Sequence, residues 1–391
     1  MKHSLVVFLL SAMCFAQQIQ IDGQTTCVNH QPSAEIPSAI DHLNRGLEHA
    51  KRQDWDNAIL EYNEAIRLNP NHAEAYNHRG GAFYSKQEYD KAIADYTKAI
   101  TLDPGNAVTY NNRGNAHREN KDYKKAIADY TRAIKNDPGY AVAYNNRGSA
   151  HLENNSYKKA ISDYTRSIRI DPKNTVTYND RGVAYNRLGR RPKAIKDFSR
   201  AIELDPDCET AYFNRAITYS RHPTVRNAVT ITSLYSTPSG WGTESISLNG
   251  PPHYDEAIDD FTQVIRINPT RTDIYLYRAD LYLQKARPAR LGIETILLDD
   301  LDKAIENLTQ FLAHHSDSYR AFSSRASAQY SKKDYDKAIE DYSRAINLSP
   351  DPERLYYWRG KAYRELNDNE KANADLKMAK ELWRDAKKAK R

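Results

Sequence analysis

Cysteine is scarce in this chain of 391 residues, which has only Cys14, Cys27 and Cys208. No two of them have the close spacing of zinc or haem ligands, and the 12 histidines are scattered. Three cysteines so far apart do not make a disulfide framework. Cys27 and Cys208 could pair only if the fold brought their Cα atoms within about 7 Å. We therefore expect no metal and no cofactor.

The chain also lacks the short motifs of the common enzyme classes. There is no nucleophile elbow, zinc-binding helix, phosphate loop or dinucleotide fingerprint. The one adjacent histidine pair, His314–His315, stands alone. The formal charge of +6 is a small excess spread along the chain, which argues against nucleic acid as a partner. The sequence predicts a globular protein that is not an enzyme.

Long apolar runs are missing after the N-terminus, so no membrane span is expected. The one apolar run, LVVFLLSAMCFA at 5–16, follows Lys2 and ends at the small residue Ala16. This layout is typical of a secretory signal peptide cleaved after Ala16. A lipid on Cys14 is less favoured, because the bulky Met13 stands where lipoprotein signals have a small residue. The sequence predicts an exported protein, periplasmic or secreted.

What the chain does contain is an internal repeat of 34 residues. An arginine marks each unit, at Arg45, Arg79, Arg113, Arg147, Arg181 and Arg215, and then, after two longer intervals, at Arg278, Arg325 and Arg359. Nine units fill residues 39–386 once two insertions, at about 222–252 and 287–300, are set aside. The predicted organisation is a signal peptide at 1–16, a flexible leader at 17–38, nine repeats at 39–386 and a basic tail at 387–391.

Each unit predicts two helices. In the fourth unit, apolar and small residues recur at helical spacing over 141–155 and again over 157–172. Pro172 ends the second helix and begins the turn to the next unit. A single hairpin of this size cannot bury its apolar stripe, so neighbouring units must stack into a continuous core.

This pattern resembles the tetratricopeptide repeat, which has an aromatic at position 4, small residues at 8 and 20, an aromatic at 24, alanine at 27 and proline at 32. The second repeat matches at Tyr76, Gly80, Ala92, Tyr96, Ala99 and Pro104. Alanine replaces the glycine in repeats 6 to 8, and the proline is missing from repeats 7 and 9. The resemblance implies an all-α, right-handed superhelical solenoid whose first helices line a concave groove.

Arginine occupies position 7 of all nine repeats, and position 23 is acidic in all of them except repeat 7, which has Asn307. An arginine and a carboxylate at a fixed offset predict a structural ion pair in each repeat, rather than an anion-binding stripe. The tyrosines at positions 4 and 24 are expected in the core and between repeats.

Asparagine recurs at positions 5 and 6 of the first helices, where it is a poor helix former. No internal role for these amides is evident from the sequence, and an amide can pair with both the N–H and the C=O of an extended peptide. The row resembles the asparagine ladder of O-linked N-acetylglucosamine transferases; the alternative is a relic of recent duplication. The predicted groove residues are Asn44, Asn77, Asn111, Asn112, Asn145, Asn146, Asn179, Asn214, Tyr277 and Trp358.

Two further features concern the kind of partner and the longer insertion. The lysines and asparagines of the carboxylate clamp are absent from repeats 1 and 3, which have Leu43 and Val108 at two of its positions. This argues against capture of an acidic C-terminal tail. The longer insertion alternates apolar and polar residues around TPSGWG, which predicts a β-hairpin.

Two functions are consistent with these observations. The first is an exported interaction scaffold that binds a protein or extended peptide in the groove. The alternative is a structural subunit of the cell envelope that self-associates or docks to a membrane machine.

Overall fold

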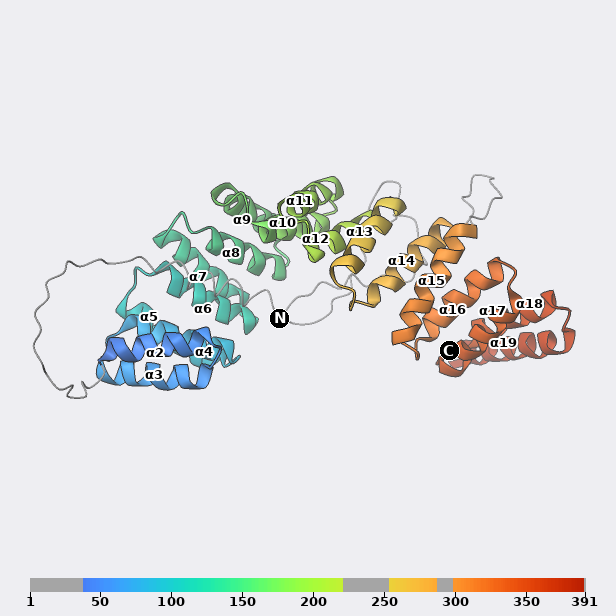
Figure 1. Cartoon of the computed structure of the whole chain (residues 1–391), viewed down its shortest axis with the longest axis horizontal. Helices are drawn as coiled ribbons and strands as arrows, with labels where there is room; N and C mark the ends of the chain where they lie inside the picture. Colours follow the sequence, from blue (N-terminus) through green and yellow to red (C-terminus); the bar gives the residue numbers. More distant parts are fainter. Residues whose placement is uncertain (1–37, 221–252, 287–297, 390–391) are drawn as a thin grey trace, which may run out of the picture. The chain divides into compact units, whose positions relative to one another are not determined.

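The computed structural model describes residues 38–220, 253–286 and 298–389 (Figure 1). These residues form α-helices joined by short turns, and no β-strand occurs among them. The expected all-α class is therefore confirmed. The predicted signal peptide, the hairpin at 222–252 and most of the insertion at 287–300 lie outside the described residues, although the end of that insertion already belongs to a helix that begins at Leu298.

The described residues contain eighteen helices, which alternate as first and second helices of successive repeats. Their bounds are α2 Ala39–Lys51, α3 Trp55–Leu68, α4 Ala73–Ser85, α5 Tyr89–Leu102, α6 Ala107–Glu119, α7 Tyr123–Asn136, α8 Ala141–Glu153, α9 Tyr157–Ile170, α10 Thr175–Arg187, α11 Arg191–Leu204, α12 Glu209–Ser220, α13 Tyr254–Ile267, α14 Asp273–Lys285, α15 Leu298–His314, α16 Tyr319–Ser331, α17 Tyr335–Leu348, α18 Glu353–Glu365 and α19 Asn369–Ala389.

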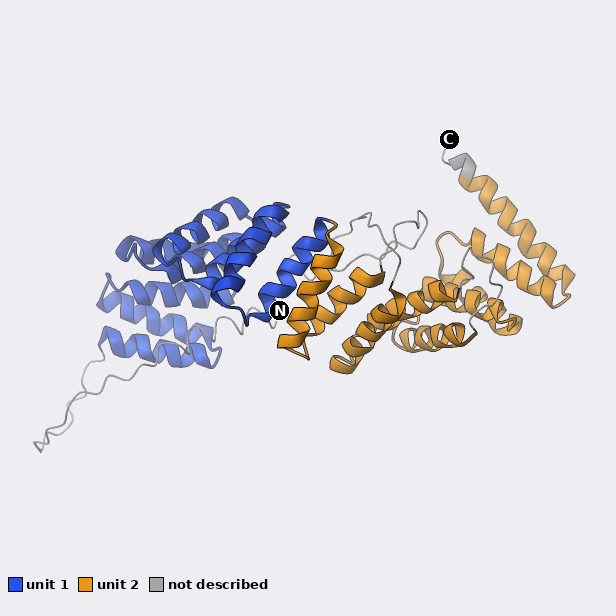
Figure 2. Ribbon diagram, turned by 90° about the horizontal axis from the view of Figure 1, so that it is seen from above, with its two compact units in different colours: residues 1–188, 230–245 blue, residues 189–229, 246–391 orange. Residues whose placement is uncertain are grey.

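The helices fall into two compact units, which Figure 2 distinguishes by colour. Unit 1 contains α2 to α10, and unit 2 contains α11 to α19. Within each unit, a first helix packs against the second helix of its own repeat, and that second helix packs against the next first helix. This is the stacking that the repeat pattern predicts.

Seven of the first helices end in a turn that the sequence pattern does not predict. In repeat 4, Asn155 has a φ of 55°, in the left-handed region, and the amide of Ser156 donates to the carbonyl of His151 at 2.7 Å. This closes the end of α8 and reverses the chain into α9. The same left-handed residue recurs at Gln53, Gln87, Lys121, Gly189, Lys333 and Asn367.

The glycine at position 8 has a clear steric reason. A Cβ added to Gly148 would stand 2.7 Å from Cε1 of Tyr164, the aromatic at position 24 of the same repeat. The equivalent Gly114 would place its Cβ 2.7 Å from Tyr130. The glycine therefore makes room for a fully buried tyrosine ring.

The first helices lie on the inner side of unit 1. Successive first helices contact one another directly, α2 with α4, α4 with α6, α6 with α8 and α8 with α10. Among the described helices of this unit, no two second helices pack together as closely as these pairs of first helices do. A stack whose first helices are closer together than its second helices must curve with the first helices inside. The first helices therefore form the inner side of the stack in unit 1.

Candidate peptide-binding face

The arginine at position 7 is structural. Arg113 donates from Nε and Nη2 to the two oxygens of Asp129, at 2.8 and 2.7 Å, and from Nη1 to Oγ1 of Thr97 at 3.0 Å. Its guanidinium also lies 5.7 Å from the centre of the Tyr110 ring. Because Thr97 belongs to the preceding repeat, one arginine joins its own hairpin to the previous one.

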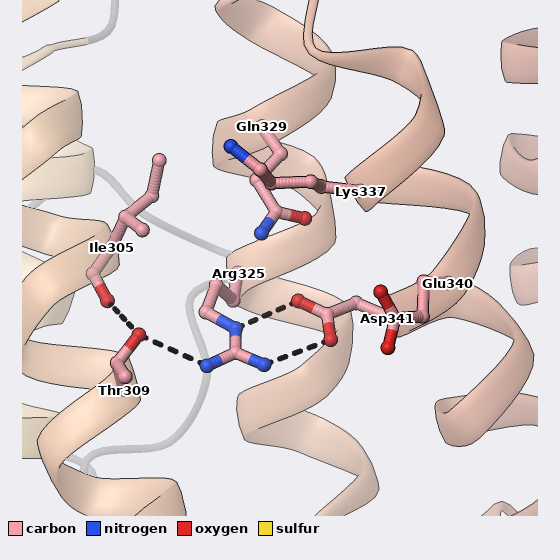
Figure 3. A pocket seen from close by; sticks show the side chains of 7 residues that line it. All are labelled: Ile305, Thr309, Arg325, Gln329, Lys337, Glu340 and Asp341. Atoms are coloured by element: carbon pink, nitrogen blue, oxygen red, sulfur yellow. Dashed lines mark hydrogen bonds and ion pairs between the residues drawn. The ribbon is translucent and has the colours of Figure 1, made fainter.

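The predicted ion pair is confirmed in six repeats. The same two-pronged pairing joins Arg79 to Asp95, Arg113 to Asp129, Arg147 to Asp163, Arg215 to Asp260, Arg325 to Asp341 and Arg359 to Asp375. Figure 3 shows Arg325 between Asp341 and Thr309 from close by, at the edge of a surface cavity of about 270 Å³. An anion-binding stripe is excluded in these repeats, since carboxylates already occupy the guanidinium groups.

Repeat 1 departs from this prediction. Glu61, at position 23, pairs with Nδ1 of His42 at 2.7 Å rather than with Arg45, which is exposed. In the described residues no repeat precedes the first, so Arg45 has no hydroxyl like that of Thr97 to hold it. In repeat 7, Arg278 donates to the amide oxygen of Asn307 at 2.8 Å, so the neutral residue takes the place of the carboxylate.

The candidate binding surface is formed by the first helices of repeats 2 to 5. Positions 2, 6, 9 and 13 are spaced by four, three and four residues, so they share one side of each helix, with position 5 beside them. We call this surface of α4, α6, α8 and α10 the first-helix face. Its amides form an ordered row between neighbouring helices.

The amide row has a consistent geometry. Nδ2 of Asn112 donates to Oδ1 of Asn77 at 3.2 Å, and Nδ2 of Asn146 donates to Oδ1 of Asn111 at 2.9 Å. Each bond joins position 6 of one repeat to position 5 of the repeat before it. Asn145 instead donates to Oγ1 of Thr177 on α10 at 3.0 Å.

The expectation that these amides have no internal role is therefore wrong: they hold successive first helices together. Asn111 is only 3% exposed, so its amide is part of the interior. Asn112 and Asn146 are half-buried, and their Oδ1 atoms accept no hydrogen bond within the described chain. A partner on this face can still reach the acceptors of these two residues.

The other predicted residues are not part of one row. Asn44 is exposed on α2, and Asn179, on α10, donates to Oδ1 of Asp180 at 3.4 Å. Asn214 and Tyr277 lie in unit 2 and are half-buried. The Tyr277 ring stacks on Phe261 with centroids 5.6 Å apart, so it packs between repeats.

Trp358 is 39% exposed on α18, in unit 2. Its ring meets those of Tyr330 and Tyr357 edge-on, and Tyr357 lies against Trp383 of the terminal helix α19. Trp358 thus belongs to a partly exposed aromatic cluster.

The sequence interpretation missed the charged and apolar residues of the first-helix face. Val108 and Val176, at position 2, are 38% and 52% exposed. Glu119 and Glu153, at position 13, share the face with Asp180, at position 6. The 34-residue period could have found the valines and the glutamates, which recur in consecutive repeats, but not Asp180, since position 6 is asparagine in the two preceding repeats.

Burial alters the acid–base behaviour of this face. It raises the pKa of the Asp180 carboxyl to about 6, although hydrogen bonds from Asn179 and Asn145 oppose the shift. Burial also raises the pKa of Glu153, and the nearby Arg118 opposes this. Near both carboxyl groups there is therefore too little positive charge to offset the cost of burying the ionised form.

Among the described helices, none is both long and apolar enough to cross a membrane. The same residues hold no group of three or more histidine, cysteine or acidic side chains placed to bind a metal ion. Cys208 is a free thiol, while Cys27 lies outside the described residues.

Comparison with protein families agrees with this repeat architecture. Tetratricopeptide repeat models match residues 43–107, 111–175, 176–208 and 353–382, and a TPR repeat model matches 326–367. These matches together span more than half of the chain. The chain is therefore a tetratricopeptide repeat protein. No curated protein sequence matches it at a significant level.

Solved structures with a similar repeat include three of note. MamA is 29% identical, with 41% of this chain and 94% of that one covered and a TM-score of 0.39. PilF of Pseudomonas aeruginosa is 17% identical, with coverages of 62% and 97% and a TM-score of 0.48. YrrB, described as a TPR protein with an unusual peptide-binding site, is 22% identical, with coverages of 44% and 90% and a TM-score of 0.39.

Proposed function

We propose that this protein is an exported interaction scaffold that binds a protein or an extended peptide segment on the first-helix face of unit 1. The observation that carries the proposal is the combination, on one inner surface, of amide acceptors that no described residue uses and exposed valines. The Oδ1 atoms of Asn112 and Asn146 suit peptide N–H groups, and Val108 and Val176 offer apolar contacts.

The scaffold has no catalytic activity of its own in this proposal. The repeats occupy most of the chain, and the first-helix face presents amides, valines and carboxylates rather than a nucleophile with a base. Export, to the periplasm or outside the cell, rests on the predicted signal peptide at 1–16. A mature chain that begins at Gln17 in mass spectrometry would support it, and retention of residues 1–16 would contradict it.

Site-specific photocrosslinking tests the binding face. A photoreactive amino acid replaces Val176, on the first-helix face, and in a control chain it replaces Lys158, which is exposed on the second helix α9. The modified chains are expressed in the native host and irradiated. We expect a discrete adduct from position 176 and none from position 158. Equal labelling at both positions, or none at either, would contradict a specific face.

The identity of the adduct distinguishes the scaffold from the alternative of a self-associating envelope subunit. An adduct of this chain with a second protein supports the scaffold. An adduct with twice the mass of this chain would instead favour self-association.

A further inference from the structure

Three carboxylates of the first-helix face are electrostatic neighbours, and Arg118 is the cation that acts on Glu153 among them. Glu119 is on α6, Glu153 on α8 and Asp180 on α10, and the electrostatic neighbours of Glu153 are Arg118, Glu119 and Asp180. When all three carboxyls are ionised, Arg118 offsets only one of them. The group thus has an excess of negative charge on the first-helix face.

These carboxylates differ in how well they are bonded. Arg118 donates from Nη2 to Glu119 at 3.2 Å, and Tyr84 is also hydrogen-bonded to Glu119. Asp180 accepts hydrogen bonds from the Asn179 and Asn145 amides. Glu153 is half-buried, and no residue in the described part of the chain donates a hydrogen bond to it. Glu153 is therefore the carboxylate most in need of an external donor.

The buried nitrogen Nε of Arg118 has no hydrogen-bond partner either. Arg118 and Glu119 are only 15% and 14% exposed, so solvent reaches them poorly. This N–H is a donor, so a backbone carbonyl of a bound segment can satisfy it and a cationic side chain cannot.

We propose that the first-helix face recognises its partner through a lysine or arginine side chain that pairs with Glu153, presented by an extended segment containing both basic and apolar residues. Charge complementarity selects a cation, because the cluster holds two more carboxylates than guanidinium groups. The exposed Val108 and Val176, at position 2 of α6 and α10, select the apolar residues. Side chains of an extended segment that point the same way are about 7 Å apart, so it can meet both kinds of surface.

This inference rests on the proposed function and adds the chemistry of the partner. A labelled, capped twelve-residue peptide of glycine, serine and valine with lysine at every third position is the probe. Its twin has glutamate in place of lysine. Fluorescence anisotropy with the full-length chain, at 50 and 300 mM NaCl, measures binding.

We expect the lysine peptide to bind more tightly than the glutamate peptide. Its binding should weaken steeply at the higher salt concentration. Glu153→Gln keeps the size of the side chain and should weaken lysine-peptide binding about fivefold or more, since the pair loses its charge. The control Glu64→Gln, on the exposed side of α3, should bind like the parent. Circular dichroism checks that both variants are folded.

Equal binding of the two peptides, binding of neither, or parental affinity in Glu153→Gln would overturn the inference. Its failure is distinguishable from failure of the proposed function. A protein adduct from position 176 together with an inert lysine peptide would leave the scaffold standing and remove only the basic partner.

Discussion

Arg113 and Asp129 form a two-pronged ion pair, with N–O distances of 2.8 and 2.7 Å, between the two helices of repeat 3. The Asp129 side chain is 8% exposed and that of Arg113 19%. Removing the arginine would leave a buried carboxylate without its partner. We expect Arg113→Met to lower the free energy of unfolding by about 3 kcal/mol or more, measured by urea denaturation.

Arg45 supplies a matched control, because it holds the same repeat position without the ion pair. Arg45→Met should change stability by about 0.5 kcal/mol at most. The double variant Arg113→Met/Asp129→Leu should recover most of the loss, since an apolar pair needs no compensation. If both arginine variants lose the same stability, the ion pair is not what stabilises repeat 3.

The pairing of Arg113 with Asp129 could be predicted because both residues belong to one hairpin, whose geometry is fixed by the repeat. The contact of Arg113 with Thr97 could not, because it depends on how one repeat sits on the previous one. The hydrogen bonds of the amide row could not be predicted for the same reason. Asn146 and Asn111, which one of these bonds joins, are 35 residues apart, one more than the period. The period of the sequence identifies which residues are equivalent in different repeats. Predicting the contacts between repeats also requires the alignment of each repeat on its neighbour, which the period does not give.

The left-handed turn residues lead to a second prediction. Lys121 has a φ of 61° just after α6 and is exposed. Lys121→Gly should stabilise the protein by about 0.5–1 kcal/mol, since relief of about 1–2 kcal/mol of backbone strain exceeds the entropy that glycine loses. Thermal unfolding measures the change.

The control for Lys121→Gly places the same substitution inside a helix. Lys98 is exposed within α5, where glycine should destabilise by about 0.5–1 kcal/mol. Opposite signs at the two positions are expected. If Lys121→Gly is destabilised instead, the lysine side chain stabilises the turn by more than the strain of its left-handed backbone costs.

The amide row gives a third prediction, which tests its two hydrogen bonds separately. Helix propensity alone favours alanine over asparagine by up to about 0.7 kcal/mol. Asn146→Ala, however, leaves Oδ1 of the buried Asn111 unpaired, at a cost of about 1–3 kcal/mol. Asn146→Ala should therefore be destabilised.

Asn112→Ala is the comparison, because its partner Asn77 is half-buried and water can replace the lost donor. This variant should be as stable as the parent in the same urea experiment, or slightly more stable. Equal losses in both variants would assign the row a uniform structural role. No loss in either would show that the bond between Asn146 and Asn111 adds nothing to stability.

The raised pKa of Asp180 makes the stability of unit 1 depend on pH. The folded-state pKa is about 6, against an ordinary value of 3.8. Between these values the folded chain holds a proton at Asp180 that the unfolded chain has released, so stability falls as pH rises from about 4 to 6 and stays lowered above that. Asp180→Asn cannot ionise. It should match the parent near pH 4 and be more stable at pH 8, as urea unfolding across this range will measure.

Asp122 provides a control of opposite sign for the same titration. It caps α7, and its hydrogen bond with the Lys125 side chain, together with one from the Lys125 amide, lowers its pKa. Its contribution is therefore present above pH 4 and is lost as pH falls through its lowered folded pKa. Asp122→Asn should be less stable than the parent at pH 8, where Asp180→Asn is more stable. If Asp180→Asn instead loses stability at pH 8, the ionised carboxylate is needed by the amides of Asn145 and Asn179, and those hydrogen bonds outweigh the cost of its burial.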